Sequence, residues 1–492
     1  MRPTSQLGEG PPKAEGPLHH PSVVIGLSLI ILLAANPASP SYSDPPPLVI
    51  IKGGTLIDGV GNPPLPHAWI LLEGGRIKLI GKAGGFPIPR GTKVVQARGE
   101  TILPGLIDAH VHLGTSGVVG FTFSRPQSPA EEVFRRSLRS ELLGGVTQVR
   151  DLHMPLEVGQ RLTKQLEAEP TLGARLIYAG LMMTAPEGYG APYAIQVDSP
   201  REGRLRVEES ALAGAHVIKI AVTSRTLGKA AIPSMAPEVI GAIVEAAHAR
   251  GLPVAAHVAG ATAADLKNAI SAGVDSLEHM PGNWDPLGVP DTLYTTAGLV
   301  PEILARHITL VPTLSVEVGE TYGPMLSELS EDPSLRLRLT PMQRQLMAAN
   351  LEDFSHNARR QAMAEAGRKR MEIFLQEIGR LHAAGVSLAA GSDAGSGFTF
   401  HGNLHTEIEL LNRGGLSPLE AIRAATQVSA RLLGVLQDEG TVEIGKRADL
   451  LLVRGDPLQD LQVLREVDRV VIGGKVVDVE RLVRQVKKAA GN

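Results

Sequence analysis

The chain has 492 residues, a formal net charge of −3 and no cysteine. This length is enough for one large domain and a smaller one. The charge argues against a nucleic-acid-binding protein, which needs a strong basic excess. Without cysteine there can be no disulfide, no thiolate zinc site and no cysteine nucleophile.

Residues 1–44 are predicted to be a signal peptide and disordered leader, outside the folded part. Residues 23–35 form an apolar run that follows a polar stretch and precedes small residues suited to cleavage. The run is short for a transmembrane helix but fits the core of a signal peptide. We therefore expect an exported protein, periplasmic or secreted, whose contact with the membrane is through this segment alone. An uncleaved segment would leave the protein membrane-anchored, and a wrongly assigned start codon is a third interpretation.

Both ends of the remaining chain contain short strands, in residues 45–103 and 438–485. In each region a Gly-Gly pair, Gly74-Gly75 or Gly473-Gly474, separates two apolar runs. Glycine accepts the positive φ that tight hairpins require. Neither end has enough strands for a stable sheet alone. Together they predict one composite β-sandwich domain, with two unrelated decorations as the alternative.

Between these ends, residues 104–437 alternate between apolar strands and amphipathic helices. This α/β alternation predicts a (β/α)8 TIM barrel. A helix is expected over Pro237–Arg250, and another is expected to begin at the N-cap Ser417. Residues 317–377 look like an inserted helical excursion that could act as a lid. The eight expected strands are 107–112, 146–151, 176–179, 217–221, 254–258, 276–279, 309–313 and 387–393.

Six polar residues lie at or near the C-terminal ends of these strands, where parallel barrels assemble their chemistry. His110 and His112 end the first strand, and side chains two apart on a strand share a face. Each residue alone has an ordinary explanation, such as a hydrogen-bonded core histidine or a lysine that extends to the barrel edge. Their shared placement instead predicts one metal centre. The set is His110, His112, Lys219, His257, His279 and Asp393.

The motifs around these residues resemble the metal-dependent amidohydrolase superfamily. The match is closest to its imidazolonepropionase-like and Xaa-Pro dipeptidase (prolidase) members, and it runs from about residue 51 to residue 477. The motifs are Leu-Pro-Gly-Leu-Ile-Asp-Ala-His-Val-His at 103–112, Gly-Val-Thr-Gln-Val-Arg-Asp-Leu at 145–152, Ile-Lys-Ile at 218–220, Glu-His-Met at 278–280, Gly-Ser-Asp-Ala-Gly at 391–395 and Gly-Thr-Val-Glu-Ile-Gly-Lys-Arg-Ala-Asp at 440–449.

The resemblance implies a centre of two divalent ions, with zinc the first choice and manganese, cobalt or iron as alternatives. Lys219 would be carboxylated by carbon dioxide and bridge both ions. One ion would be held by His110, His112 and Asp393, and the other by His257 and His279. A metal-bridging hydroxide would then attack a C–N bond of the amide or peptide type, with Asp393 as general base.

Two alternatives to this function remain open. The same nucleophile could attack a lactone, a carbamate or an organophosphate ester. A barrel that binds a ligand or a partner without turnover is the alternative from outside the enzymes. We expect a small-molecule substrate that is an amide or resembles a dipeptide, and a homo-oligomer stays open.

The weaker candidates would contact the substrate. They are His401, Tyr189 and His153, which lie in or beside loops after expected strands. The loop Gly188-Tyr189-Gly190 departs from the Gly-His-Gly that many relatives carry, and Val258 follows His257 where relatives often have a second histidine nearby. These departures change the pocket wall, so a relative's substrate does not transfer directly. Arg150 and Asp151 are expected to pair with one another.

Overall fold

The computed structural model describes residues 48–115, 131–224, 231–282, 298–321 and 323–488. The segment expected to be a signal peptide and leader lies outside these residues, so export stays a prediction. Within the described parts of the chain, no helix is long and apolar enough to cross a membrane.

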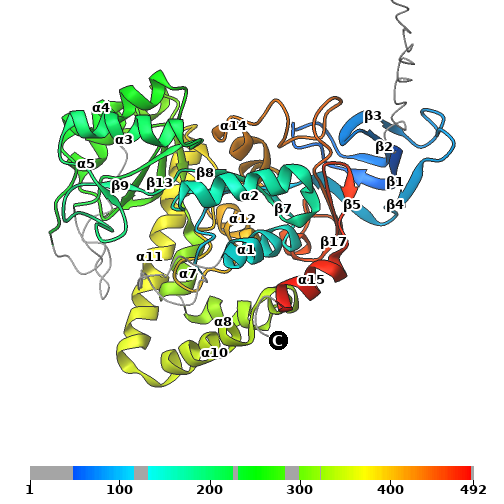
Figure 1. Cartoon of the computed structure of the whole chain (residues 1–492). Coiled ribbons are helices and arrows are strands. Elements are labelled where there is room, and N and C mark those ends of the chain that lie inside the picture. Colours follow the sequence, from blue (N-terminus) through cyan, green and yellow to red (C-terminus); the bar gives the residue numbers. More distant parts are fainter. Residues whose placement is uncertain (1–47, 116–130, 225–230, 283–297, 322, 489–492) are drawn as a thin grey trace, which may run out of the picture. The chain divides into compact units, whose positions relative to one another are not determined.

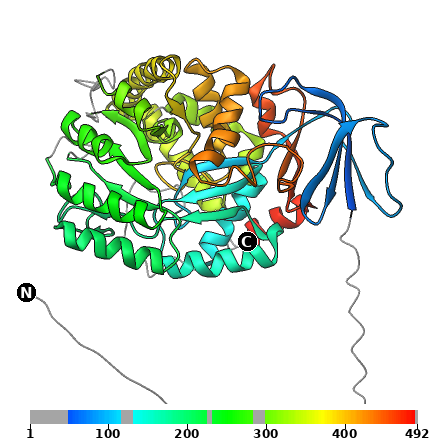
Figure 2. The same ribbon diagram turned by 90° about the horizontal axis from the view of Figure 1, so that it is seen from above.

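Strands from the two ends of the chain share one eight-stranded sheet, in the order β18-β17-β16-β5-β1-β2-β3, with β4 also paired to β1. The two ends join where β5 and β16 pair antiparallel, with Leu103 opposite Leu451, and Figure 2 shows the blue and orange-red strands side by side. A packing of this sheet into two layers stays a prediction. The strands are β1 (Leu48–Leu56), β2 (Leu65–Glu73), β3 (Arg76–Lys82), β4 (Lys93–Gln96), β5 (Glu100–Pro104), β16 (Leu450–Arg454), β17 (Val467–Ile472) and β18 (Lys475–Val476).

The two predicted Gly-Gly hairpins form as expected. Gly74 and Gly75 join β2 to β3 with φ of 57° and 81°, and Gly473 and Gly474 join β17 to β18 with φ of 56° and 74°. Positive φ at both central positions matches the right-handed twist of the flanking strands. Glycine is the residue that adopts this conformation without steric cost.

The middle of the chain forms two parallel sheets, one ordered β6-β7-β8 and the other β10-β9-β11-β12-β13-β14-β15. Each of the eight expected strands is present, although the last is much shorter than expected, and β9 and β10 were not expected. The strands are β6 (Leu106–Val111), β7 (Val146–Asp151), β8 (Arg175–Tyr178), β9 (Met183–Thr184), β10 (Ile195–Gln196), β11 (Ile218–Ala221), β12 (Val254–Ala259), β13 (Ser276–Gly282), β14 (Thr309–Val311) and β15 (Ser387–Leu388).

The last strand is short because residues 389–394 bond to the first strand through isolated hydrogen bonds. Ala109 N donates to Ala390 O at 3.0 Å, and Asp393 N donates to His110 O at 2.9 Å. These bonds bring the segment after β15 against β6, and the metal-ligand candidates of both segments come with it.

Helices follow most of the parallel strands. α4 buries the stripe Val239, Ile240, Ile243, Val244 and Ala247, and Ser417 caps α13 through the expected box with Glu420. These helices are α1 (Glu131–Leu143), α2 (Leu156–Ala168), α3 (Pro200–Leu212), α4 (Pro237–Ala249), α5 (Ala263–Ala272), α6 (Val300–Ala305), α12 (Leu404–Arg413), α13 (Pro418–Arg423), α14 (Ser429–Leu432) and α15 (Val479–Lys488).

The excursion between β14 and β15 is helical in its described residues, and its longest helix continues directly into the chain that leads to β15 (Figure 1). A buried ion pair between Arg370 and Glu317, 2.7 Å apart, ties α11 to α7. The role of this excursion as a lid stays a prediction. Its helices are α7 (Leu314–Thr321), α8 (Gly323–Glu331), α9 (Pro333–Arg338), α10 (Pro341–His356) and α11 (Ala358–Ala383).

Candidate metal centre

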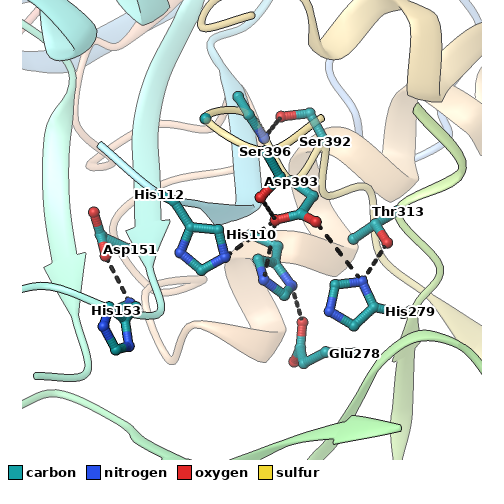
Figure 3. Close-up of polar contacts among 12 residues, drawn as sticks. His110, His112, Asp151, His153, Glu278, His279, Thr313, Ser392, Asp393 and Ser396 are labelled. Atoms are coloured by element: carbon teal, nitrogen blue, oxygen red, sulfur yellow. Dashed lines mark hydrogen bonds and ion pairs between the residues drawn. The ribbon is translucent and has the colours of Figure 1, made fainter. Parts of the chain in front are cut away.

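His110 and His112 meet the carboxylate of Asp393 at the end of β6. The Nε2 atoms of His110 and His112 lie 3.6 Å and 3.1 Å from Asp393 Oδ1, as Figure 3 shows. One ligand atom from each of the three residues can be chosen so that all lie within 4.8 Å of one another. The His-x-His spacing and the Gly-Ser-Asp-Ala-Gly loop therefore converge on one point.

Two further histidines surround this cluster. His279 Nδ1 lies 4.0 Å from Asp393 Oδ2, and the ring centroids of His279 and His110 are 4.8 Å apart. The centroids of His257 and His279 are 4.4 Å apart. The four imidazoles thus come from three segments, at β6, β12 and β13, into one small volume beside a single carboxylate.

Lys219 is buried beside these histidines, with a relative exposure of 3%. Its Nζ has no hydrogen-bond partner among the residues that the structure describes. Burial lowers the pKa of Lys219 to about 8, partly offset by Glu278 and Asp393. The lysine charge in turn contributes to the lowered pKa values of His110 and His257, after burial itself. The structure therefore brings all six sequence-predicted ligands into one region.

Unusual backbone conformations help to aim these side chains. His279, Thr313 and Asp393 adopt φ of 73°, 50° and 55°, a region that residues with a β-carbon rarely occupy. Such strain persists when surrounding contacts enforce it, and it tends to cluster at functional sites. On a regular strand Glu278 and His279 would face opposite sides. The register of β12 against β13 shifts just after Glu278, and both side chains reach the centre.

Glu278 is a functional candidate that the sequence analysis missed. Its Oε2 lies 2.8 Å from His110 Nδ1. Its Oε1 accepts from Arg150 Nη2 at 2.8 Å and from Ser276 Oγ at 2.5 Å. An ionised Glu278 makes His110 donate from Nδ1, and this leaves the Nε2 lone pair free on the Asp393 side. A signal existed, because a glutamate inside a buried strand must have a partner.

The expected pair of Arg150 with Asp151 is wrong. Arg150 donates from Nε to Ala109 O at 2.6 Å as well as to Glu278. Asp151 instead accepts from the backbone amides of Leu113 and His153, each at 2.8 Å. Neighbouring residues on a strand point to opposite faces. The Arg150 side chain therefore extends toward Glu278, and the Asp151 carboxylate accepts hydrogen bonds from the turns after β6 and β7.

Thr313 is a second missed residue. Its Oγ1 lies 2.7 Å from His279 Nδ1 (Figure 3). A threonine at the end of an apolar strand carries little signal in sequence, because its role depends on the left-handed backbone that turns its hydroxyl inward.

The three candidate substrate contacts have different surroundings. Tyr189 is half-buried and stacks on His257, with centroids 4.2 Å apart and planes at 23°. His153 lies 6.5 Å from His112 between ring centroids, and its Nδ1 accepts from Met182 N at 3.3 Å. Burial lowers the pKa of His153 to about 3, so this ring is neutral at pH 7. Tyr189 and His153 thus lie at the edge of the cluster.

His401 lies behind the centre. Its Nδ1 is 2.8 Å from Glu141 Oε1 and its Nε2 is 3.3 Å from Thr115 O. The Thr115 hydroxyl in turn donates toward two backbone carbonyl oxygens. Its Oγ1 lies 2.9 Å from His112 O and 2.7 Å from Gly395 O. Because both nitrogens of His401 have protein acceptors, this geometry favours a structural role, and a substrate contact stays an untested prediction.

The donor set fits divalent metal ions. Within the described parts of the chain, three buried atoms have no hydrogen-bond partner: His110 Nε2, His257 Nε2 and Lys219 Nζ. An unpaired buried polar atom costs about 1–3 kcal/mol. Imidazole nitrogen with carboxylate oxygen suits zinc and its first-row neighbours. An ion bound at this point would satisfy these atoms together.

Comparisons with known proteins agree with this donor set. A model described as "Amidohydrolase family" matches residues 101–477. An uncharacterized protein of Mycobacterium tuberculosis (strain ATCC 25618 / H37Rv) is 29% identical, over 77% of this chain and 85% of its own length. Ochratoxinase of Aspergillus niger is 26% identical, over 90% of this chain and 89% of its own. The structure is similar to a Xaa-Pro dipeptidase with bound methionine, with a TM-score of 0.67, 26% identity, and coverage of 87% and 99% of the two chains.

Proposed function

The chain belongs to the amidohydrolase family and is a hydrolase acting on carbon–nitrogen bonds, and we propose that it works with two divalent ions held by the six-residue cluster. The observation that supports this most is the convergence of His110, His112 and Asp393 beside Lys219, a buried lysine whose Nζ has no hydrogen-bond partner in the described part of the chain. We also propose that the two parallel sheets together form the closed barrel that the sequence predicts.

Under this proposal His110, His112 and Asp393 hold one ion, and His257 and His279 hold the other. Lys219 lies between the two groups as a carbamate. With a pKa of about 8, part of the Lys219 amine is neutral at pH 7 and can react. The neutral amine nitrogen would form a bond to the carbon of carbon dioxide and lose one proton. Because the cationic form must first lose a proton to become the neutral amine, two protons leave in all when the buried cation becomes an anion. Two bound ions would supply the Lewis acidity that polarises a scissile carbonyl and acidifies water.

The residues of the chain perform the proton transfers and the positioning. Asp393 accepts the proton of the attacking water at a carboxylate oxygen and passes it to the leaving nitrogen. Glu278 keeps the proton of His110 on Nδ1, and Tyr189 forms a wall against His257.

For the substrate class we propose an amide in which a small cyclic or apolar group adjoins the scissile bond, with Xaa-Pro dipeptides and N-acyl amino acids first. This choice is supported by two similar proteins whose names are ochratoxinase and Xaa-Pro dipeptidase. Tyr189 and Ala259 stand where many members of the resembled family have histidines, so the preferred side chain is expected to differ from theirs.

The test combines metal analysis with a substrate panel. Purified protein should contain about two divalent ions per chain, and a chelator should remove both ions and activity, which zinc with bicarbonate should restore. The metal-loaded protein is then assayed on Xaa-Pro dipeptides, N-acyl amino acids, lactones and organophosphate esters. A folded chain that binds no divalent ion, or that hydrolyses only the esters, would overturn the proposal.

A further inference from the structure

A buried carboxylate on α12 holds the start of the helical excursion. Glu407 has 0% relative exposure and accepts hydrogen bonds from Leu314 N at 3.0 Å, Ser315 N at 2.8 Å and Ser315 Oγ at 2.7 Å. Leu314 begins α7. A helix N-terminus leaves backbone amides without intrahelical partners, so Glu407 acts as an external cap for α7 from a helix more than ninety residues away in sequence.

The residue just before this cap carries the contact to His279. Thr313 has φ of 50°, which is costly for a β-branched residue. It follows β14 and precedes α7, and its Oγ1 lies 2.7 Å from His279 Nδ1. The backbone on the helix side of Thr313 is fixed by two amide hydrogen bonds to Glu407, and the Ser315 hydroxyl adds a third bond. The strained turn is therefore maintained by a carboxylate that does not itself touch the histidine.

Electrostatics place Glu407 near the centre as well. Burial raises the pKa of Glu407 to about 7, its hydrogen bonds to Ser315 and Leu314 lower it, and the charge of Asp393 raises it further. A carboxylate buried at such cost, with no role in holding the proposed ions, needs another explanation. Its three donors all belong to the turn that carries Thr313.

We propose that Glu407 is a positioning residue for the metal centre, which acts through the Thr313 turn to set the orientation of the His279 imidazole. The inference rests on the proposed function, because His279 matters here as a ligand. Under this inference the contacts form one continuous series: Glu407 bonds to the start of α7, the start of α7 fixes Thr313, and Thr313 contacts His279. The helical excursion and the metal centre are thereby coupled through the same hydrogen bonds. The partner of a metal-ligating histidine typically changes metal affinity by about 10–100-fold when removed.

The experiment measures metal binding directly on the full chain. Zinc affinity is determined by competition with a chelator, and the visible absorption of Co²⁺-loaded protein reports the ligand geometry. Glu407→Gln puts an amide N–H where one backbone N–H needs an acceptor, and Thr313→Val removes the hydroxyl with little change of shape. Each should weaken binding of one of the two ions by about 10–100-fold and change the cobalt spectrum, while Thr313→Ser should restore wild-type values.

Two comparisons make the test specific. Glu409→Gln is the matched control, because Glu409 lies on the same helix and bonds to Arg465 Nε at 2.8 Å; its metal affinity should equal that of the wild type. The double variant Glu407→Gln/Thr313→Val should lose no more metal affinity than the single variant that binds metal less tightly. The reason is that the effects of residues that act as one unit do not add.

The outcomes separate this inference from the proposed function. A wild-type chain that binds no divalent ion refutes the function and the inference together. A wild type with two ions, beside Glu407→Gln and Thr313→Val variants with unchanged affinities and spectra, refutes the inference alone. Losses that add fully in the double variant would also overturn it, since they would show two independent effects.

Discussion

The two halves of the candidate centre differ in how the protein holds them. On one side, His110 and His279 each have Nδ1 fixed by a buried partner, Glu278 or Thr313. On the other, Lys219 has no hydrogen-bond partner among the described residues at Nζ, the one polar atom of its side chain. The two histidines of the first half thus have one ring nitrogen fixed by the protein, and His110 keeps its Nε2 without a described partner. The second half lacks a balancing charge and a hydrogen-bond partner in the described residues. A group bound between the two halves would supply both.

This difference identifies Lys219 as the residue on which loading of the centre depends. A buried amine with a pKa of about 8 is poorly stabilised as a cation, and its conversion to an anion changes the charge between the histidines by two units. Fixed imidazoles on one side then give the incoming ions a defined geometry. The predictions below test each half in turn.

The largest effect is expected from Lys219→Ala. Without the bridging anion, both ions should be lost, and turnover should fall below detection, because the histidines alone would bring cationic ions together without a negative charge between them. Elemental analysis and assay of the same sample check this. A Lys219→Ala protein that still contains two ions would contradict the division into two halves.

Asp393→Asn should come next. The amide cannot accept the proton of the attacking water, so turnover should fall by about 10³-fold or more, while the ion of the His257 and His279 side is retained. The measurement is kcat together with the metal content. Normal turnover in this variant would show that the proton acceptor is another group.

Glu278→Gln should have an intermediate effect. The Gln amide can still approach His110, but it no longer enforces the Nδ1–H tautomer or balances Arg150, so affinity for the ion on this side should fall by about 10–100-fold. Chelator competition gives the number. Glu73→Gln serves as a control, because Glu73 pairs with the exposed Lys78 on the eight-stranded sheet that the two chain ends share. An effect limited to thermal stability, with metal affinity unchanged, would argue against this role.

The proposed ligands and the residues that orient them differ in how far the sequence could predict them. The six proposed ligands are identifiable because each follows or ends an apolar run, and the ends of parallel strands lie at one edge. Glu278 and Thr313 are not, because their directions depend on the positive φ of His279 and Thr313, which regular strand periodicity does not anticipate. The sheet shared by both ends was predictable from its glycine hairpins. The pairing of Arg150 was mispredicted because proximity in sequence was mistaken for proximity in space.

The smallest effect on turnover is expected from substitution of His401, which supports the chain around His112 through Thr115. His401 bridges Glu141 and Thr115, and Thr115 contacts the carbonyls of His112 and Gly395. His401→Gln should remove the imidazole that lies 2.8 Å from the buried Glu141 carboxyl group. A buried polar group that loses its hydrogen-bond partner costs about 1–3 kcal/mol, so the free energy of unfolding should fall by that order, as urea denaturation would measure. Because His401 does not face the ligand atoms, kcat and KM of the folded variant should stay within a few-fold of wild type. A normal free energy of unfolding with a tenfold higher KM would instead make His401 a substrate contact. His401 and its neighbour Thr115 would then belong to the substrate pocket rather than to the residues that support the metal centre.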